Sequence, residues 1–254
     1  MKKSRKIENI KLFEKDIIES VSYNVETAKN YLDENGVDYE RFINKGLKQI
    51  EKSIKKKEKE GSKGLFFKRV VLAAEIVNNL YKERTFGHVK FQKLMYLCEQ
   101  VSNMELSTRY VKQAAGPYDS RFMHTIDKEF KRLNWFNIDI KQENGFKTYE
   151  YSLGKNIDSY KLYFNNYYKD SISGITWLID TFKTPQTKKV ELVATIYYCL
   201  DEFLKNNKDF SNELLVEKVF SWSIEKKKKF TTEDITKAHN WMIENKLIPK
   251  KNYN

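Results

Sequence analysis

The feature that most constrains the fold is a helical pattern of apolar residues followed by a rigid Gly-Pro turn. Residues 85–97 read TFGHVKFQKLMYL, and residues 114–119 read AAGPYD. Apolar residues spaced three and four apart predict an amphipathic helix in the first segment. Gly116 permits backbone angles that other residues avoid, and Pro117 fixes the next φ, so the turn holds Tyr118 in one direction. Together these segments predict a packing and docking unit.

The side chains of this unit allow two interpretations, and the sequence leaves both open. The aromatic residues either fill the core or line a groove that receives another chain. Lys90 and Lys93 are expected on the solvent side of the helix, and Asp119 is expected to cap the next helix, because a carboxylate there accepts backbone N–H hydrogen bonds. The candidate partner-binding residues are Phe91, Gln92, Tyr96, Gly116, Pro117, Tyr118 and Asp119.

The rest of the chain predicts a mainly α fold. Apolar stripes at helical spacing recur over residues 70–80 and 122–133, and again from residue 157 onward. The one β signal is an alternating pattern over residues 135–151 around Asn144-Gly145, a dipeptide that favours tight hairpins. We therefore expect a multi-helical bundle with one small β-hairpin. A helix followed directly by a hairpin is also winged-helix-like, so the hairpin either covers the core or contacts nucleic acid.

Three regions are expected along the chain. Residues 1–62 form an N-terminal α-hairpin, whose second helix begins at the N-cap Asp38. The glycine-flanked residues 61–64 predict a linker. A helical core that carries the β-hairpin covers residues 63–156, and a C-terminal helical region packed on that core covers residues 157–254.

The chain carries a formal net charge of +12 at pH 7. Such an excess favours a polyanionic partner, because lysines neutralise phosphates and release counterions. An AT-rich coding sequence explains the positive charge equally well, because the excess is nearly all lysine. Lysine recognises phosphate less specifically than arginine. Residues 225–230 are expected to form a basic loop. Under the nucleic-acid interpretation the contact residues are Lys55, Lys56, Lys57, Lys59, Lys141, Lys147, Lys226, Lys227, Lys228 and Lys229.

The sequence predicts no catalytic, metal or cofactor site. His88, His124 and His239 are isolated from one another, and no phosphate-binding glycine loop is present. Cys98 and Cys199 lie in helical patterns, which predicts buried free thiols in a reducing cytoplasm. There is no secretory signal and no apolar run of the roughly 20 residues that span a membrane. We expect a cytoplasmic protein that is not an enzyme. The alternative is an enzyme whose active site is assembled only by tertiary contacts.

Two stretches of the sequence resemble a known family. Residues 91–97 (FQKLMYL) and 116–119 (GPYD) resemble the Panacea-type (SocA-like) domain, in which a helix with a Lys-Leu-x-Tyr core precedes a Gly-Pro-aromatic turn. A closer resemblance, over roughly residues 65–250, is to an accessory or C-terminal module associated with type I restriction-modification proteins. Its further matches are Trp135-Phe136, the ELVAT run at residues 191–195 and the WM…LIP pattern at residues 241–249. Residues 1–60 lie outside this resemblance.

The resemblance implies a non-enzymatic role in a bacterial conflict system, by which we mean toxin–antitoxin, phage defence or restriction-modification. Its partner would be a protein: a toxin, an effector or a restriction subunit. The alternative is a basic DNA- or RNA-binding protein that uses the hairpin and the lysine runs. Whether the chain forms a homo-oligomer is left open.

Overall fold

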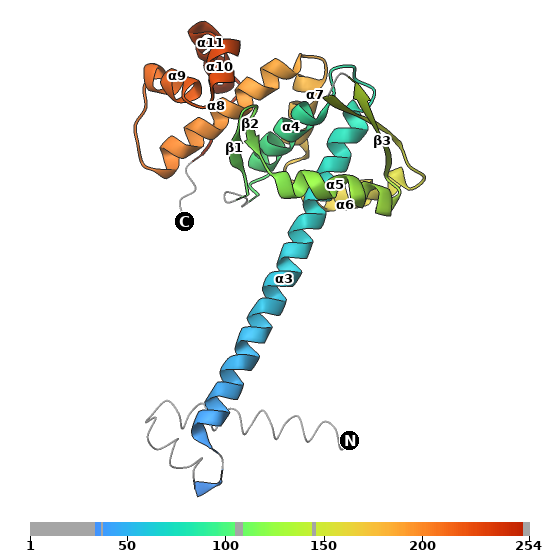
Figure 1. The fold of residues 1–254 in the computed structure, drawn as a ribbon, viewed down its shortest axis with the longest axis vertical. Coiled ribbons are helices and arrows are strands. Elements are labelled where there is room, and N and C mark those ends of the chain that lie inside the picture. The colour runs from blue at the N-terminus through green and yellow to red at the C-terminus, as the bar shows by residue number, and fades with distance from the viewer. Residues whose placement is uncertain (1–33, 37, 105–108, 144–145, 251–254) are drawn as a thin grey trace. The chain divides into compact units, whose positions relative to one another are not determined.

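The computed structural model describes residues 34–36, 38–104, 109–143 and 146–250 (Figure 1). The chain divides into two compact units, Met1–Gly64 and Leu65–Asn254. Residues 63–156 and 157–254, expected to be separate regions, thus lie almost wholly within the second unit. The first helix of the predicted N-terminal hairpin and the tip of the β-hairpin at Asn144-Gly145 lie outside the described residues.

Helix α3 (Tyr39–Leu80) begins in the first unit and ends in the second. Its start is capped as expected, because the N–H of Arg41 donates to Oδ1 of Asp38 at 3.0 Å. The predicted linker at residues 61–64 is wrong in its conformation, since α3 runs through it without a break. A glycine inside a helix costs only about 1 kcal/mol relative to alanine. Two glycines therefore do not force a helix to end.

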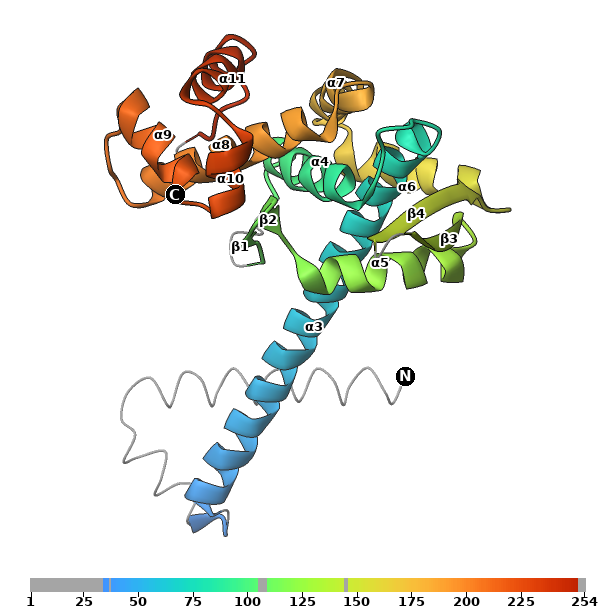
Figure 2. The same ribbon diagram turned by 45° about the horizontal axis from the view of Figure 1, so that its top comes forward.

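The second unit is mainly helical and contains two small antiparallel sheets (Figures 1 and 2). After α3 the elements are α4 (His88–Val101), β1 (Val111–Gln113), β2 (Gly116–Tyr118), α5 (Ser120–Leu133), β3 (Phe136–Glu143), β4 (Phe146–Leu153), the 3-10 helix η1 (Ile157–Ser159), α6 (Tyr160–Tyr168), α7 (Ile172–Lys183), α8 (Thr187–Lys205), α9 (Asn212–Phe220), α10 (Ile224–Lys229) and α11 (Thr232–Glu244).

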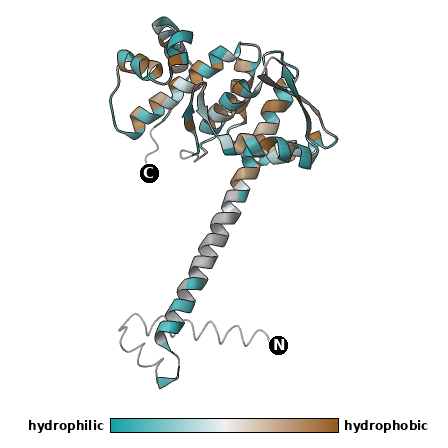
Figure 3. Cartoon of the chain, in the orientation of Figure 1, coloured by the Kyte–Doolittle hydropathy of each residue, from teal (hydrophilic) through white to brown (hydrophobic). Residues whose placement is uncertain are grey.

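The core of this unit is centred on α4, which packs against α7, α8 and β2. Every residue of α4 from Lys90 to Glu99 except Gln92 is buried. Apolar residues also colour the part of α3 that belongs to this unit (Figure 3). The expectation that Lys90 and Lys93 face solvent is wrong, because both side chains are fully buried. A helix enclosed on several sides has no solvent face.

The predicted hairpin is confirmed as β3 and β4, which pair from Phe136↔Leu153 to Glu143↔Phe146. Its inner face is apolar: Phe136, Ile138 and Tyr151 are buried, and β3 packs against α5. This is the arrangement of a hairpin that covers the core. Whether its outer face also contacts nucleic acid stays a prediction.

A second hairpin was not predicted. Gly116-Pro117 belongs to strand β2, which pairs with β1 from Val111↔Tyr118 to Gln113↔Gly116, so the turn itself lies one step earlier, at Ala114-Ala115. Proline is rare in strands because it cannot donate a ladder hydrogen bond, and it is tolerated at an edge. In a two-stranded sheet both strands are edges.

Side-chain caps begin several helices of this unit. Asp119 caps α5 as expected, by accepting the N–H of Phe122 at 3.1 Å. The structure also places caps at Ser211 for α9 and at Thr231 for α11. The expected basic loop at residues 225–230 is wrong, because residues 224–229 form the helix α10, capped by Ser223. Lysines have good helix propensity, so a lysine run after a serine cap favours a helical turn.

Gly116 is required by its backbone angle and by its surroundings. Its φ is +108°, and a Cβ there would lie 2.9 Å from Oγ1 of Thr195, whose side chain is fully buried. We expect Gly116→Ala to lower the free energy of unfolding by about 1–3 kcal/mol, through backbone strain and this contact. Chemical denaturation followed by tryptophan fluorescence measures it, because all four tryptophans lie in the second unit.

The matched control is Gly174→Ala in α7. There a new Cβ meets only Val101 at ordinary contact distances of 3.8 and 3.9 Å, so this variant should be as stable as the parent or up to about 1 kcal/mol more stable. Equal effects of the two substitutions would contradict the structural requirement for Gly116.

Candidate functional site

The Gly-Pro strand and its flanking helices are held by a buried ionic network centred on Arg69. Nε of Arg69 donates to Oε1 of Glu99 at 2.6 Å, and Nη1 donates to Oδ2 of Asp119 at 2.7 Å. The hydroxyl of Tyr110 donates to the second oxygen of Glu99 at 2.5 Å. The guanidinium also lies 4.1 Å from the ring centroid of Phe122. The network joins α3, α4, the segment before β1 and the start of α5.

The charges in this network stabilise one another because each is removed from water. Burial is the largest single effect and disfavours the charge on Arg69, but Glu99, Tyr110 and Asp119 together outweigh it and raise the pKa of the guanidinium. Burial raises the pKa of Glu99, and Arg69 opposes that shift. Buried ion pairs depend on every partner being present, since removing one leaves the other charged, buried and unpaired.

We therefore expect Arg69→Met to lower the free energy of unfolding of the second unit by about 3–5 kcal/mol, or to prevent its folding. The control is Arg132→Met, which removes the exposed pair of Arg132 with Glu129 and should cost at most about 0.5 kcal/mol. Denaturant titration of both variants distinguishes the two sites. An effect of Arg69→Met as small as that of Arg132→Met would contradict the role assigned to the network.

A second buried polar cluster lies on the other side of the Gly-Pro strand. Nζ of Lys93 donates to the carbonyl oxygen of Pro117 at 2.7 Å. Glu191 of α8 accepts from Lys226 at 2.7 Å and from Lys229 at 2.6 Å. The side chain of Lys226 is fully buried, so its expected contact with nucleic acid is wrong for this fold.

Burial lowers the pKa of Lys93 to about 7, and the neighbouring charge of Lys226 adds to the effect while Glu191 opposes it. Above pH 7 the unfolded chain therefore keeps a proton that folded Lys93 has released. Stability must then rise with pH until the ordinary lysine range. From pH 7 to pH 9, we expect the free energy of unfolding of the parent to rise by about 2 kcal/mol relative to that of Lys93→Met, which has no amine to titrate. A difference that stays constant over this range would contradict it.

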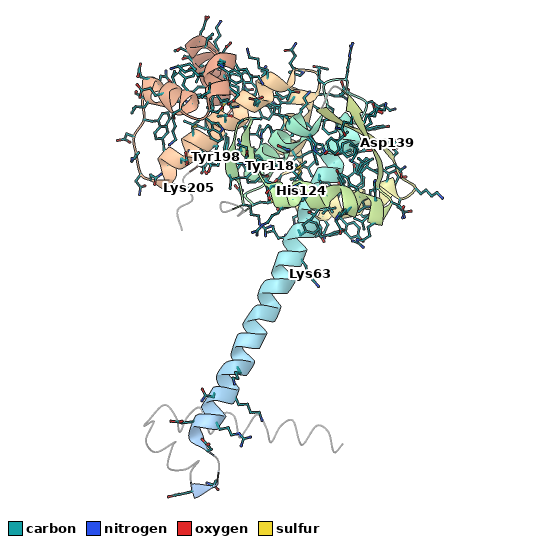
Figure 4. All side chains as sticks on the ribbon, in the orientation of Figure 1. Lys63, Tyr118, His124, Asp139, Tyr198 and Lys205 are labelled. Carbon is teal, nitrogen blue, oxygen red and sulfur yellow. The ribbon has the colours of Figure 1, made fainter. Side chains whose placement is uncertain are left out.

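The third feature is a cleft of about 770 Å³. Four tyrosines line it: Tyr96 of α4, Tyr110, and Tyr197 and Tyr198 of α8. Figure 4 labels Tyr198 and another lining residue of α8, Lys205. The other polar lining groups include Gln100, Asn103, Asp201, Glu202, Asn206, Lys246 and Lys250, and the apolar ones are Val101, Met104, Leu247, Ile248 and Pro249.

The cleft forms where three helices end. α4, α8 and α11 each finish with a residue in the left-handed conformation: Asn103, Asn207 and Lys246, with φ of 50°, 49° and 57°. At each end the next two N–H groups donate back to the last turn, for example from Asn103 to Gln100 and from Met104 to Glu99. The carbonyl groups that give these helix ends their negative partial charge are therefore partly satisfied.

Tyr96 is the distinctive group of the cleft. Its side chain is only 2% exposed, and its hydroxyl has no hydrogen-bond partner among the described residues. Its ring packs edge-on against Tyr110 and Tyr197, with centroids 4.9 and 6.0 Å apart. Burial and the nearby Asp201 raise the pKa of Tyr96 far above its ordinary value, so the phenol is neutral. A buried hydroxyl without a partner costs about 1–3 kcal/mol, and a ligand atom can relieve that cost.

The predicted partner-binding residues are only partly brought together. Phe91 is fully buried, so it fills the core, and its prediction as a partner-binding residue is wrong. Gly116, Pro117 and Asp119 are buried beside the ionic clusters, where they support the fold. Gln92 and Tyr118 are half-buried, and neither lines the cleft. Of the predicted set, Tyr96 alone is a lining residue.

The predicted nucleic-acid residues do not share one environment. Lys227 and Lys228 are exposed on α10, and Lys229 pairs with Glu191. Lys141 of β3 pairs with Glu150 at 2.8 Å. The backbone of Lys55, Lys56, Lys57 and Lys59 belongs to α3 and that of Lys147 to β4, and their side chains lie outside the described part of the structure.

A histidine, a carboxylate and a hydroxyl do converge at one place. The hydroxyl of Tyr151 lies 3.3 Å from Nε2 of His88 and from Oδ1 of Asp127, and His88 stacks on Tyr149 with centroids 3.4 Å apart. Burial lowers the pKa of His88 to about 4, and burial with Asp127 raises that of Tyr151. The phenol is therefore a poor nucleophile, and the three groups fasten β4 to α4 and α5. They do not line the tyrosine cleft.

The thiols and the two other histidines do not form a reactive cluster among the described residues. Cys98 and Cys199 are buried free thiols, as expected, and burial raises the pKa of Cys199 to about 12. His124 is exposed on α5, and His239 contacts Asn212. Within residues 34–36, 38–104, 109–143 and 146–250, no group of three or more His, Cys, Asp or Glu side chains could hold a metal ion.

Comparison with family models and with curated proteins finds no match for this chain. Among the described helices, none is long and apolar enough to cross a membrane.

Proposed function

We propose that this chain is a non-enzymatic docking protein of a bacterial conflict system, and that its second unit binds a segment of a partner protein in the tyrosine cleft. The observation that carries this proposal is the hydroxyl of Tyr96: it is buried, neutral and without a hydrogen-bond partner among the described residues, and Tyr96 lines a cleft of about 770 Å³. A ligand atom that reaches this hydroxyl completes its hydrogen bond, which favours occupancy of the cleft.

The chemistry around the cleft supports binding in preference to catalysis. A catalytic site needs a nucleophile or base whose pKa lies near the working pH and which a substrate can reach. In the described part of the chain the thiols are buried, and His88 contacts the hydroxyl of Tyr151. Lys93 is buried and donates to the carbonyl oxygen of Pro117. The resemblance to Panacea-type domains and to modules of restriction-modification loci supports the choice of a conflict system.

Nucleic-acid binding is the alternative function. Of its predicted contact residues, Lys227 and Lys228 are exposed lysines for which no acidic hydrogen-bond partner is found within the described residues. Two adjacent lysines supply a small electrostatic footprint, whereas sequence-independent binding uses many phosphate contacts. The cleft therefore supports the protein-docking proposal more strongly.

The variant Tyr96→Phe tests the proposal with a change of one oxygen atom. Because the hydroxyl has no hydrogen-bond partner within the part of the chain that the structure describes, its removal should leave the free energy of unfolding unchanged or raise it by up to about 1 kcal/mol. Capture of a stoichiometric partner from the native cell by the tagged full chain should fall. Fluorescence denaturation and quantitative affinity capture measure the two effects.

Tyr163→Phe is the matched control, since Tyr163 is 44% exposed, lies on α6 and does not line the cleft. It should capture as much partner as the parent. Undiminished capture of the partner by Tyr96→Phe would count against docking in the cleft. So would a reduced capture that is accompanied by unfolding of the variant, because the loss would then come from instability.

A further inference from the structure

We propose that the occupant of the tyrosine cleft is an acidic segment of the partner protein, with an apolar residue placed among the tyrosines and a neighbouring carboxylate placed at Lys246 and Lys250. This inference rests on the proposed function and specifies the chemistry of its partner. It follows from which polar groups of the cleft are already paired and which are not.

The two carboxylates of the cleft are neutralised within the fold. Glu202 lies 2.8 Å from Nζ of Lys112 and 3.2 Å from Nζ of Lys218, and these lysines lower its pKa against the effect of burial. Oε2 of Glu202 makes no hydrogen bond of good geometry with the described residues, but the two ammonium groups beside it offset its charge. Asp201 pairs with Lys205 at 2.5 Å. The negative charge of the cleft is therefore met by lysines of the same chain.

The charged side chains of the cleft that have no counter-ion in the described part of the chain are cations. Lys246 and Lys250 line the cleft with exposed side chains, and neither has an acidic partner within the described residues. The neutral phenol of Tyr96, which lines the same cleft, has a proton to donate. The three helix ends do not reverse this balance, because their left-handed caps already donate to the terminal carbonyl groups. Ammonium and phenol donors together complement carboxylate and carbonyl oxygens.

The apolar lining supplies the second half of the specificity. Met104, Leu247 and Ile248 line the same cleft as the four tyrosines, and Ile248 is 38% exposed. Such a mixture of aromatic and aliphatic walls with a few polar groups suits one apolar side chain flanked by polar backbone. An aromatic or aliphatic anchor in a pocket is also the usual centre of a protein interface.

A nucleic acid suits the same cleft less well. A phosphodiester strand brings one negative charge with each nucleotide, whereas only two lysines of the cleft, Lys246 and Lys250, have no acidic partner among the described residues. Tyr198, the tyrosine with the most accessible ring, is already covered by Nζ of Lys112 at 5.7 Å, which obstructs base stacking on that face. A peptide can place a single carboxylate at the lysines and keep its other groups neutral.

The test is a selection of random nine-residue peptides displayed on phage against the immobilised full chain. Enriched peptides should carry an aromatic or aliphatic residue next to Asp or Glu. For a synthetic peptide of the enriched sequence, fluorescence anisotropy should show an affinity about tenfold lower for the double variant Lys246→Glu, Lys250→Glu, because charge reversal at a binding site turns attraction into repulsion. Tyr96→Phe should also weaken binding.

The matched control is the double variant Lys227→Glu, Lys228→Glu, which makes the same charge change on α10, outside the cleft. Its affinity should stay within about twofold of the parent at 150 mM salt, where the Debye length is about 8 Å. Equal losses in the two double variants would show a general charge effect and overturn the inference.

Other outcomes separate the occupant from the proposed function. Enrichment of basic peptides whose binding needs Tyr96 would overturn the acidic occupant and leave the docking function standing. If none of the peptides binds in a way that depends on Tyr96, both the acidic occupant and the docking function are overturned. A fluorescent 20-nucleotide single-stranded DNA or RNA that binds more tightly than any peptide, and loses affinity on Tyr96→Phe, would assign the cleft to nucleic acid and overturn both as well.

Discussion

Arg69 fixes the relative positions of four segments that are far apart in the sequence. Its guanidinium joins α3 to Glu99 of α4 and to Asp119 at the start of α5, and Tyr110 completes the network through Glu99. Charges buried this deeply are stable only when all of their hydrogen-bond partners are in place, because an unpaired buried charge is very costly. The network therefore accepts one arrangement of these elements. Small displacements of α4 or α5 would break several charged hydrogen bonds at once.

The same network determines one wall of the cleft. Tyr110 binds Glu99 through its hydroxyl and lines the cleft with its ring, and Gln100 follows Glu99 at the end of α4. On the opposite side, the cluster of Lys93, Glu191 and Lys226 fastens α4 and α8 to the Gly-Pro strand and to α10. The helices α4 and α8, which carry three of the four tyrosines, are thus each fastened by a buried polar cluster. A preformed cleft of this kind reduces the ordering cost of binding.

The distribution of paired and unpaired groups separates support from recognition. Arg69, Glu99, Asp119, Glu191 and Lys226 are buried and meet charged partners within the fold. Tyr96, Lys246 and Lys250 differ, because they line a cleft and have no hydrogen-bond or acidic partner among the described residues. A surface that selects one partner needs groups whose interactions are completed only on binding, and the cleft contains them.

Local chemistry accounts for what was predicted correctly. The cap at Asp119, the helix start at Asp38 and the β3–β4 hairpin each depend on residues within a few positions of one another. The amphipathic pattern of α5 was also readable, because one face of that helix meets the core and the other meets solvent. Such features follow from propensity and spacing, and the sequence by itself determined them along with the mainly helical class.

Tertiary structure decided which charges lie inside and where the cleft forms. Lys93 is buried because it meets the carbonyl of Pro117, 24 residues away, and Lys226 is buried because it meets Glu191, 35 residues away. Periodicity places a lysine in solvent unless such a distant partner is known. The cleft likewise combines residues from the ends of α4, α8 and α11, which no local pattern connects. Burial of charge and the meeting of helix ends depend on long-range contacts, so their energies exist only once the chain has folded.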